Sequence, residues 1–148
     1  MNVFIFSFNV NPVSVKAADQ KIAQLNSELS TQKIIQKHCD SYRLCRKVIE
    51  DCKSAKDPKA YRTKHQAEYH LHDSLKKELQ NLGVTKIPSS DKIKKRIENL
   101  ESEQTASVRE KQGLQEKKKL LNTIQQNFNV LLDAPEMQPP LSEKENTL

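Results

Sequence analysis

The segment DPKAYRTKHQAEYHLHDSLKKELQNLGVTKIPSS, residues 57–90, determines how this chain folds, because a signal for a helix boundary stands near each of its ends. Asp57 can accept a free backbone N–H as an N-cap, and Pro58 is preformed for the first helical position. Gly83 stands where a helix C-cap needs a left-handed residue. We therefore expect a helix over about residues 58–82, with one apolar face made of Leu71, Leu75, Leu79 and Leu82.

Longer helices are predicted on both sides of this segment. The first, about residues 16–53, has apolar residues at three-and-four spacing with a phase slip after Leu29. The second, about residues 90–132, follows a cap at Ser89 or Ser90 and has heptad-like spacing. The apolar positions are Ile22, Leu25, Leu29, Ile35, Tyr42, Cys45, Ile49 and Cys52 in the first helix, and Ile93, Ile97, Leu100, Leu114, Leu121, Ile124, Phe128 and Leu132 in the second.

These patterns predict an all-α fold. With 148 residues, 2 glycines and 35% hydrophobic residues, the composition suits long helices better than one thick globular core. An antiparallel coiled-coil hairpin of residues 16–53 against 90–132, with the helix 58–82 at its tip, would bury every apolar stripe in one chain. Self-association through the same seams, as a homodimer, is the main alternative. We expect residues 1–15 to be irregular and residues 134–148 to be a disordered acidic tail.

Charge and cysteine usage bear on the compartment. Residues 1–131 contain 24 basic and 15 acidic residues, so a basic body precedes the acidic tail. The cysteines Cys39, Cys45 and Cys52 have neither metal-pair nor disulfide-framework spacing, and we expect them to be reduced. The apolar run in residues 1–15 lacks the features of a secretory signal and is shorter than the roughly 20 residues that span a bilayer. The sequence therefore predicts a soluble cytoplasmic protein.

One short motif suggests chemistry. His70-Leu71-His72 matches the His-hydrophobic-His motif that holds a divalent metal in enzymes that nick single-stranded DNA. In those enzymes the histidines lie on a strand, whereas on a helix residues two apart point about 200° away from each other. The helix signals around this motif therefore argue against a metal. We predict no catalytic residue, no metal and no cofactor in this chain.

Basic clusters are the stronger candidates for a functional surface. They have two interpretations: solubilising charge, or contacts to DNA phosphates that would be sequence-independent and weakened by salt. These clusters have no aromatic platform for base stacking. The candidate phosphate contacts are Arg43, Arg46, Lys47, Lys92, Lys94, Lys95, Arg96, Lys117, Lys118 and Lys119.

The middle and C-terminal parts of the chain resemble the helical C-terminal region of the relaxases, the mobilisation nucleases of conjugative plasmids and conjugative transposons in Gram-positive bacteria. The likeness covers about residues 20–130. It is carried by CKSAKDPKAY at 52–61, HQAE at 65–68, SLKKEL at 74–79, LGVTKIPS at 82–89, and the helix that follows down to Ile124 and Phe128.

The resemblance implies a helical module without the nuclease domain that carries the nicking tyrosine and metal-binding histidines of such proteins. No catalytic residue can be carried over. The implied role is holding DNA or a relaxosome partner while another domain performs the chemistry. Two alternatives remain: a structural or oligomerisation coil with no nucleic-acid role, and, least favoured, a metal-dependent nuclease using His70 and His72.

Overall fold

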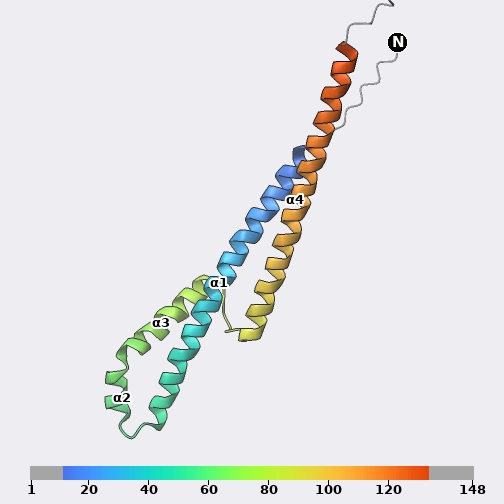
Figure 1. The fold of residues 1–148 in the computed structure, drawn as a ribbon. Helices are drawn as coiled ribbons and strands as arrows, with labels where there is room; N and C mark the ends of the chain where they lie inside the picture. Colours follow the sequence, from blue (N-terminus) through green and yellow to red (C-terminus); the bar gives the residue numbers. More distant parts are fainter. Residues whose placement is uncertain (1–11, 134–148) are drawn as a thin grey trace, which may run out of the picture.

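The computed structural model describes residues 12–133, and this part of the chain forms helices joined by short connections (Figure 1). Helix α1 spans Pro12–Ser54 and begins earlier than expected, because proline is well suited to the first position of a helix. Residues 12–15 are thus helical rather than irregular. The expectations for residues 1–11 and for the tail at 134–148 lie outside the described residues.

The helix expected over residues 58–82 is divided in two, and this prediction was wrong. Helix α2 spans Pro58–Lys64 and helix α3 spans Gln66–Asn81, with His65 between them at φ −107° and ψ 26°. The His65 ring lies 4.3 Å from the Tyr61 ring, and its Nδ1 lies 3.1 Å from Glu68 Oε1. The resulting bend lets α3 turn its buried side chains, Leu75 and Leu79, toward α1, while α2 buries none.

The predicted helix boundaries around this region are confirmed. Asp57 Oδ1 accepts hydrogen bonds of 3.1 Å from the backbone N–H groups of Lys59 and Ala60, and Pro58 opens α2. Gly83 has φ 81° and follows the end of α3, where the Val84 N–H donates to the Leu79 carbonyl at 2.9 Å. This is the hydrogen bond of a Schellman C-cap, which needs a left-handed residue.

Helix α4 spans Ser90–Asp133, and Ser89 is its cap, because the Lys92 N–H donates to Ser89 Oγ at 3.3 Å. Helix α4 runs back along the first half of α1. Lys111 pairs with Asp19, Gln104 hydrogen-bonds Asn26, and Lys33 pairs with Glu101 at 3.0 Å. Residue numbers therefore rise along α1 as they fall along α4.

The expected pairing of the two long helices over their full lengths was wrong. Helix α3, about 24 Å long at 1.5 Å per residue, returns along the second half of α1 before the connector reaches α4. His38 Nε2 lies 3.3 Å from Glu78 Oε2, and Arg43 donates to the Pro88 carbonyl, so the connector ends beside the second half of α1. Helix α1 thus packs against α4 along its N-terminal part and against α2 and α3 along its C-terminal part (Figure 1).

The main core lies where α1, α3 and α4 meet. Tyr42, Val84 and Ile87 pack against it from the edge. Leu71 and Leu82 are exposed, so only part of the predicted α3 face is buried, and Ile124, Phe128 and Leu132 are exposed because α1 does not reach that end of α4. The core residues are Leu25, Leu29, Ile35, Cys39, Leu79, Ile93, Ile97 and Leu100.

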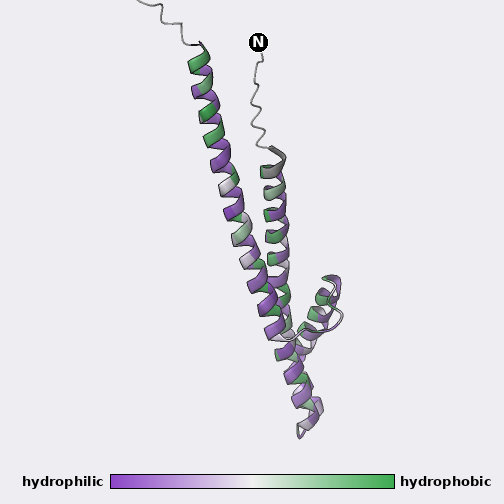
Figure 2. Ribbon diagram, turned by 90° about the vertical axis from the view of Figure 1, so that its right-hand side faces the viewer, coloured by the Kyte–Doolittle hydropathy of each residue, from purple (hydrophilic) through white to green (hydrophobic). Residues whose placement is uncertain are grey.

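Polar and apolar residues alternate along most of the helical surface (Figure 2). Among residues 12–133, no helix has both the length and the apolar character needed to cross a bilayer.

Candidate nucleic-acid interface

The structure divides the predicted phosphate contacts into two separated groups. Arg43 donates to the carbonyl of Pro88, which lies just before α4. The first group consists of Arg43, Arg46 and Lys47 of α1, where the connector contacts Arg43, and of Lys92, Lys94, Lys95 and Arg96 in the first turns of α4. Lys117–Lys119 lie farther along α4, about 33 Å from Lys95 at 1.5 Å per residue. We call the first group the connector group and the second the distal group.

The arginines of the connector group already have partners. Arg43 Nη1 lies 2.9 Å from Asp40 Oδ1, and Arg46 Nε lies 2.9 Å from Glu50 Oε1. Arg96 pairs with Glu28 across the α1–α4 contact. Arg43 and Arg96 therefore link α1 to the connector and to α4, Arg46 pairs within α1, and all three have part of their charge neutralised.

The lysines of the connector group are available instead. Lys47, Lys92, Lys94 and Lys95 are exposed, and no described carboxylate lies within ion-pair distance of them. Ile93 and Ile97 are buried against the core, with 2% and 7% exposure, and this fixes the rotation of α4. The lysines between them therefore project into solvent, where a polyanion can reach them.

Local helix stability does not explain this lysine cluster. The N-terminus of a helix carries a partial positive charge, so anionic side chains are favoured there and cationic ones are not. Lys92 lies in the first turn of α4, and Asp91 is the acidic residue of that turn. The cluster thus gathers positive charge at the positive end of the helix dipole, which makes it a better site for a phosphate than for a cation.

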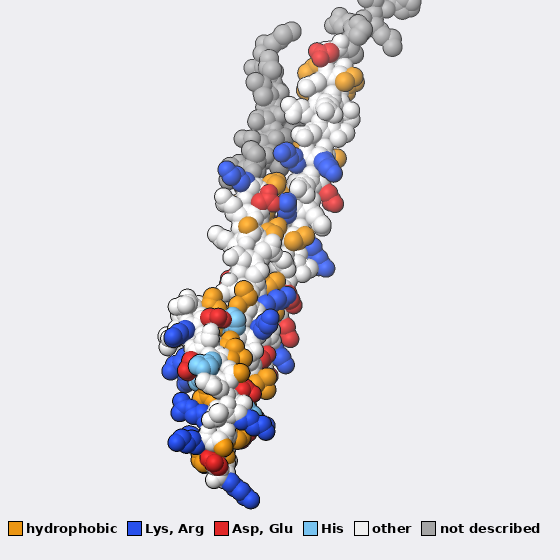
Figure 3. All heavy atoms as spheres, turned by 90° about the vertical axis from the view of Figure 1, so that its left-hand side faces the viewer, with side chains coloured by type: hydrophobic (Ala, Val, Ile, Leu, Met, Phe, Trp, Pro, Cys, Tyr) orange, Lys and Arg blue, Asp and Glu red, His pale blue; other side chains and the backbone are white. Residues whose placement is uncertain are grey.

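A further basic surface lies at the tip of the hairpin, and sequence reasoning missed it. Residues 52–64 contain five basic residues and one acidic residue, Asp57, whose carboxylate caps α2. All five basic residues are exposed, and Figure 3 shows Lys and Arg side chains gathered on this end of the molecule. In the sequence, most of these basic residues follow one another at a spacing of three, and this spacing could have indicated a basic surface. We call the five residues the tip group: Lys53, Lys56, Lys59, Arg62 and Lys64.

Packing within the tip holds α2 against α1 and α3. The Arg62 guanidinium lies 5.1 Å from the centre of the Tyr69 ring, a cation–π contact. The Cys52 thiol donates to the Pro58 carbonyl at 3.5 Å, and a hydrogen bond between Cys52 and Tyr69 is the main cause that raises the pKa of Tyr69. Arg62 also lines a shallow hollow with Lys59, Thr63 and Gln66.

Glu68, near the start of α3, has a hydrogen-bond partner of its own. Glu68 accepts a hydrogen bond from His65, which is the main cause that lowers the pKa of the Glu68 carboxyl. In the tip, the aromatic rings therefore pack against neighbouring side chains, and the basic side chains are exposed to solvent.

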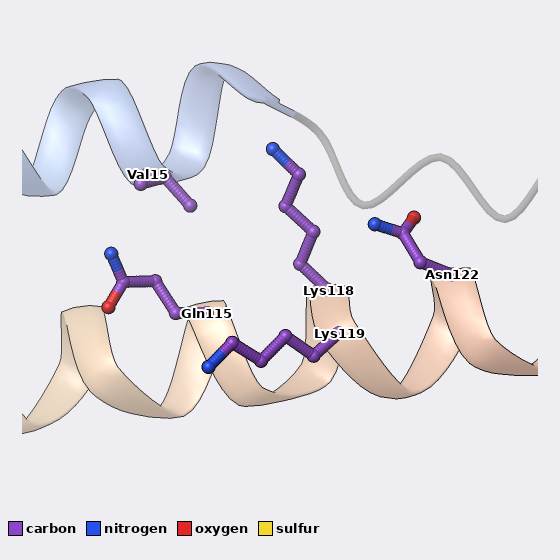
Figure 4. Close-up of a pocket in the computed structure, with 5 residues that line it drawn as sticks. All are labelled: Val15, Gln115, Lys118, Lys119 and Asn122. Carbon is purple, nitrogen blue, oxygen red and sulfur yellow. The ribbon is translucent and has the colours of Figure 1, made fainter.

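The distal group has a different setting. Lys118 and Lys119 line a shallow hollow with Val15, Gln115 and Asn122, at the point where α1 begins (Figure 4). In Figure 4 the Lys118 side chain extends toward the start of α1, whereas Lys119 lies along α4. The distal group thus faces the opposite end of the hairpin from the tip group.

His70 and His72 both lie on α3, as the helix signals predicted. His72 stacks on Tyr42 with ring centroids 4.5 Å apart, and the His70 ring lies beside the Gln66 amide. Within residues 12–133, no three His, Cys, Asp or Glu side chains are grouped so that they could hold a metal ion. Cys39, Cys45 and Cys52 are free and buried, and burial raises the pKa of Cys39 and Cys45.

The chain was also compared with known proteins. No protein-family model, no curated protein and no solved structure matches it.

Proposed function

We propose that the chain is a non-catalytic helical module of a relaxase-type mobilisation protein, which contacts DNA and relaxosome partners in the cytoplasm during conjugative transfer. The observation that carries the DNA part is the set of exposed lysines in the connector group, which have no acidic partner among the described residues. In this proposal α1 and α4 pack as an antiparallel coiled coil, which is the rigid support of that surface.

Phosphate contact is the mode of binding that these side chains favour. Lysine is a flexible point charge, which suits a phosphate better than the edge of a particular base. Stacking on bases is not supported, because Tyr42, Tyr61 and Tyr69 are half-buried and already lie against His72, His65 and Arg62. The proposed binding is therefore independent of DNA sequence.

The relaxase part of the proposal rests on the residues quoted from 52–61, 65–68, 74–79 and 82–89. Those stretches form the tip, the bend at His65, the buried side of α3 and the connector. They are the parts that fold the hairpin back on itself. A module of this kind would position DNA for a nuclease domain without performing chemistry.

The test is a fluorescence anisotropy titration of a short DNA duplex at low salt. The first variant combines Lys92→Glu, Lys94→Glu and Lys95→Glu, and its fold is favoured because glutamate suits the start of a helix. The matched variant makes the same three changes at Lys117, Lys118 and Lys119, and so alters the net charge equally on the same helix.

We expect the connector variant to lose most of its affinity and the distal variant to keep more of it. Equal losses would mean that net charge alone attracts the DNA, and absence of binding by the unmodified chain would remove the DNA part of the proposal. A third variant, Lys56→Glu with Lys59→Glu, measures the share of the tip group.

A structural or oligomerisation role is the second candidate, and one observation favours it. Large apolar side chains near the end of α4 are exposed, and their exposed fractions range from 44% at Ile124 to 75% at Leu131. A coil that serves only to associate would need such a face and would not need the exposed lysines. Sedimentation of the purified chain, with and without DNA, distinguishes the two roles.

A further inference from the structure

Helix α4 is longer than the part of α1 that runs beside it. Val15, near the start of α1, lies beside Gln115, Lys118 and Asn122 of α4. Residues 123–133 therefore extend about 16 Å beyond this point, at 1.5 Å per residue. Figure 1 shows this end of α4 projecting past the start of α1, and Figure 2 shows apolar residues on it.

The apolar residues of this end lie on one side of the helix. At 100° per residue, they fall within an arc of about 120°. Phe128 continues, at seven-residue spacing, the row of Leu114 and Leu121, which are half-buried. No described residue covers Phe128 to the same degree, since it is 52% exposed. We call the set the apolar end of α4: Leu120, Leu121, Ile124, Phe128, Leu131 and Leu132.

The sequence that precedes α1 is apolar and uncharged. Residues 1–11 contain seven apolar residues, four asparagine or serine residues and no charged residue. Three of the four phenylalanines of the chain are among them, and the fourth is Phe128. Residues at alternate positions share one face of an extended segment. Four of the apolar residues stand at such positions: Phe4, Phe6, Phe8 and Val10.

We propose that residues 4–10 lie in an extended conformation along the apolar end of α4 in the same chain, with this face of alternate residues against it. Helix α1 begins at Pro12, and the residue before a proline favours an extended backbone. Because Lys111 pairs with Asp19 and Gln104 with Asn26, α1 and α4 are antiparallel. A chain that precedes Pro12 in the direction of α1 therefore runs toward the C-terminal end of α4, as a continuation of the α1–α4 contact.

The lengths of the two segments agree. The apolar end reaches about 15 Å beyond Asn122 at Leu132, at 1.5 Å per residue. An extended segment rises about 3.3 Å per residue, so residues 4–10 span about 23 Å. The segment can therefore cover the whole apolar end directly from the start of α1.

Covalent attachment favours this segment over other partners. A segment held by a short connection acts at an effective concentration of about millimolar, whereas a second copy must be drawn from solution and lose its translational freedom. Residues 134–148 match the apolar end less well, because they contain three acidic residues and three prolines. Laying charged groups against an apolar surface costs free energy.

The proposed contact buries the apolar end within one chain. We therefore expect a monomer at micromolar concentration, in which the exposed side chains of the apolar end no longer require an oligomeric coil. This inference does not depend on DNA binding, since no basic residue takes part in the contact.

Photocrosslinking of the full chain tests the proposal. The photoreactive residue p-benzoylphenylalanine is placed at position 128, and the products are separated by size and mapped by mass spectrometry. We expect a product of monomer mass in which position 128 is joined to residues 3–10. The control places the same residue at position 130, because Val130 is 68% exposed but lies about 140° from the centre of the apolar arc.

Serine variants in the chain that carries the photoreactive residue at position 128 test which face makes the contact. Phe6→Ser with Phe8→Ser removes two apolar side chains from the proposed face, and this should lower the equilibrium constant of the contact about 100-fold. The crosslinked fraction should then fall to that of the control at position 130. Val3→Ser with Ile5→Ser is the matched variant on the other face, and it should keep most of the crosslinking.

Several outcomes would overturn the proposal. A product of dimer mass would show that a second copy covers the apolar end, and crosslinks to residues 134–148 would show that the C-terminal residues do. Absence of crosslinking at position 128, or equal crosslinking at positions 128 and 130, would show that residues 4–10 do not lie there. Equal losses in the two serine variants would contradict the proposed face.

Discussion

Leu79→Ala should destabilise the whole helical assembly, because Leu79 is the α3 residue at the junction of the three long segments. It is 1% exposed and belongs to the core shared with Cys39, Ile93 and Leu100. Truncating a buried leucine to alanine typically lowers the free energy of unfolding by 2–5 kcal/mol, and we expect about 3 kcal/mol. At about 0.05 kcal/mol per residue, an assembly with so thin a core has a total stability of about 6 kcal/mol.

The change should therefore remove about half of the stability and lower the urea midpoint by about half, at an unchanged m-value. Circular dichroism at 222 nm during urea titration measures this. Leu71→Ala is the matched control: it makes the same change on the same helix, but Leu71 is 48% exposed, and we expect a loss of at most about 1 kcal/mol. Equal losses in the two variants would show that α3 does not pack on α1 through Leu79.

Other parts of the molecule give three further predictions. Gly83→Ala should lower the free energy of unfolding, measured by urea titration, by about 1–2 kcal/mol, because Gly83 has φ 81°. Gly113→Ala, inside helix α4, should raise it by about 0.5–1 kcal/mol. The reverse order would refute the role of Gly83 as a C-cap. In variants that keep a single cysteine, Cys39 at 0% exposure should react more slowly with a thiol reagent than Cys52 at 9%, and equal rates would contradict the core placement. The pKa of Glu68 is lower in the folded chain than in the unfolded one, so the ionised carboxylate stabilises the fold above the unfolded pKa, and this stability is lost as the pH falls through the folded pKa. Glu68→Gln should therefore lower the free energy of unfolding at neutral pH and leave it unchanged in strong acid. A difference between the variant and the unmodified chain that persists in strong acid would contradict an electrostatic origin.

Local signals predicted the ends of the helices well. Asp57, Pro58, Gly83 and Ser89 all have the roles that their chemistry suggested, since a cap depends on a few neighbouring backbone groups. The break at His65 was missed, because it contains neither glycine nor proline. It depends on contacts of the His65 ring with Tyr61 and Glu68, which periodicity does not reveal.

The arrangement of the helices was less predictable. Apolar periodicity identifies the buried face of a helix, but it does not say how far a partner helix overlaps it. The bend at His65 and the connector to Pro88 set the start of α4 beside Arg43, and both depend on tertiary contacts. For the same reason the exposure of Ile124 and Phe128 did not follow from their heptad-like spacing.

The sequence indicated which residue types form the candidate site, but it did not indicate how they are arranged in space. The basic residues were evident, but only the structure separates the partnered Arg43 and Arg96 from the exposed Lys94 and Lys95. The tip group was missed because its members are spread over the end of α1, a loop and α2. Their common position follows from the fold.

The salt dependence of DNA binding tests the central proposal most directly. If Lys47, Lys92, Lys94 and Lys95 each contact one phosphate, the logarithm of the binding constant should fall against the logarithm of salt concentration with a slope of about −3.6. The triple change to glutamate at residues 92, 94 and 95 should reduce that slope to about −0.9. A slope near zero, or one that this variant leaves unchanged, would contradict phosphate binding by the connector group.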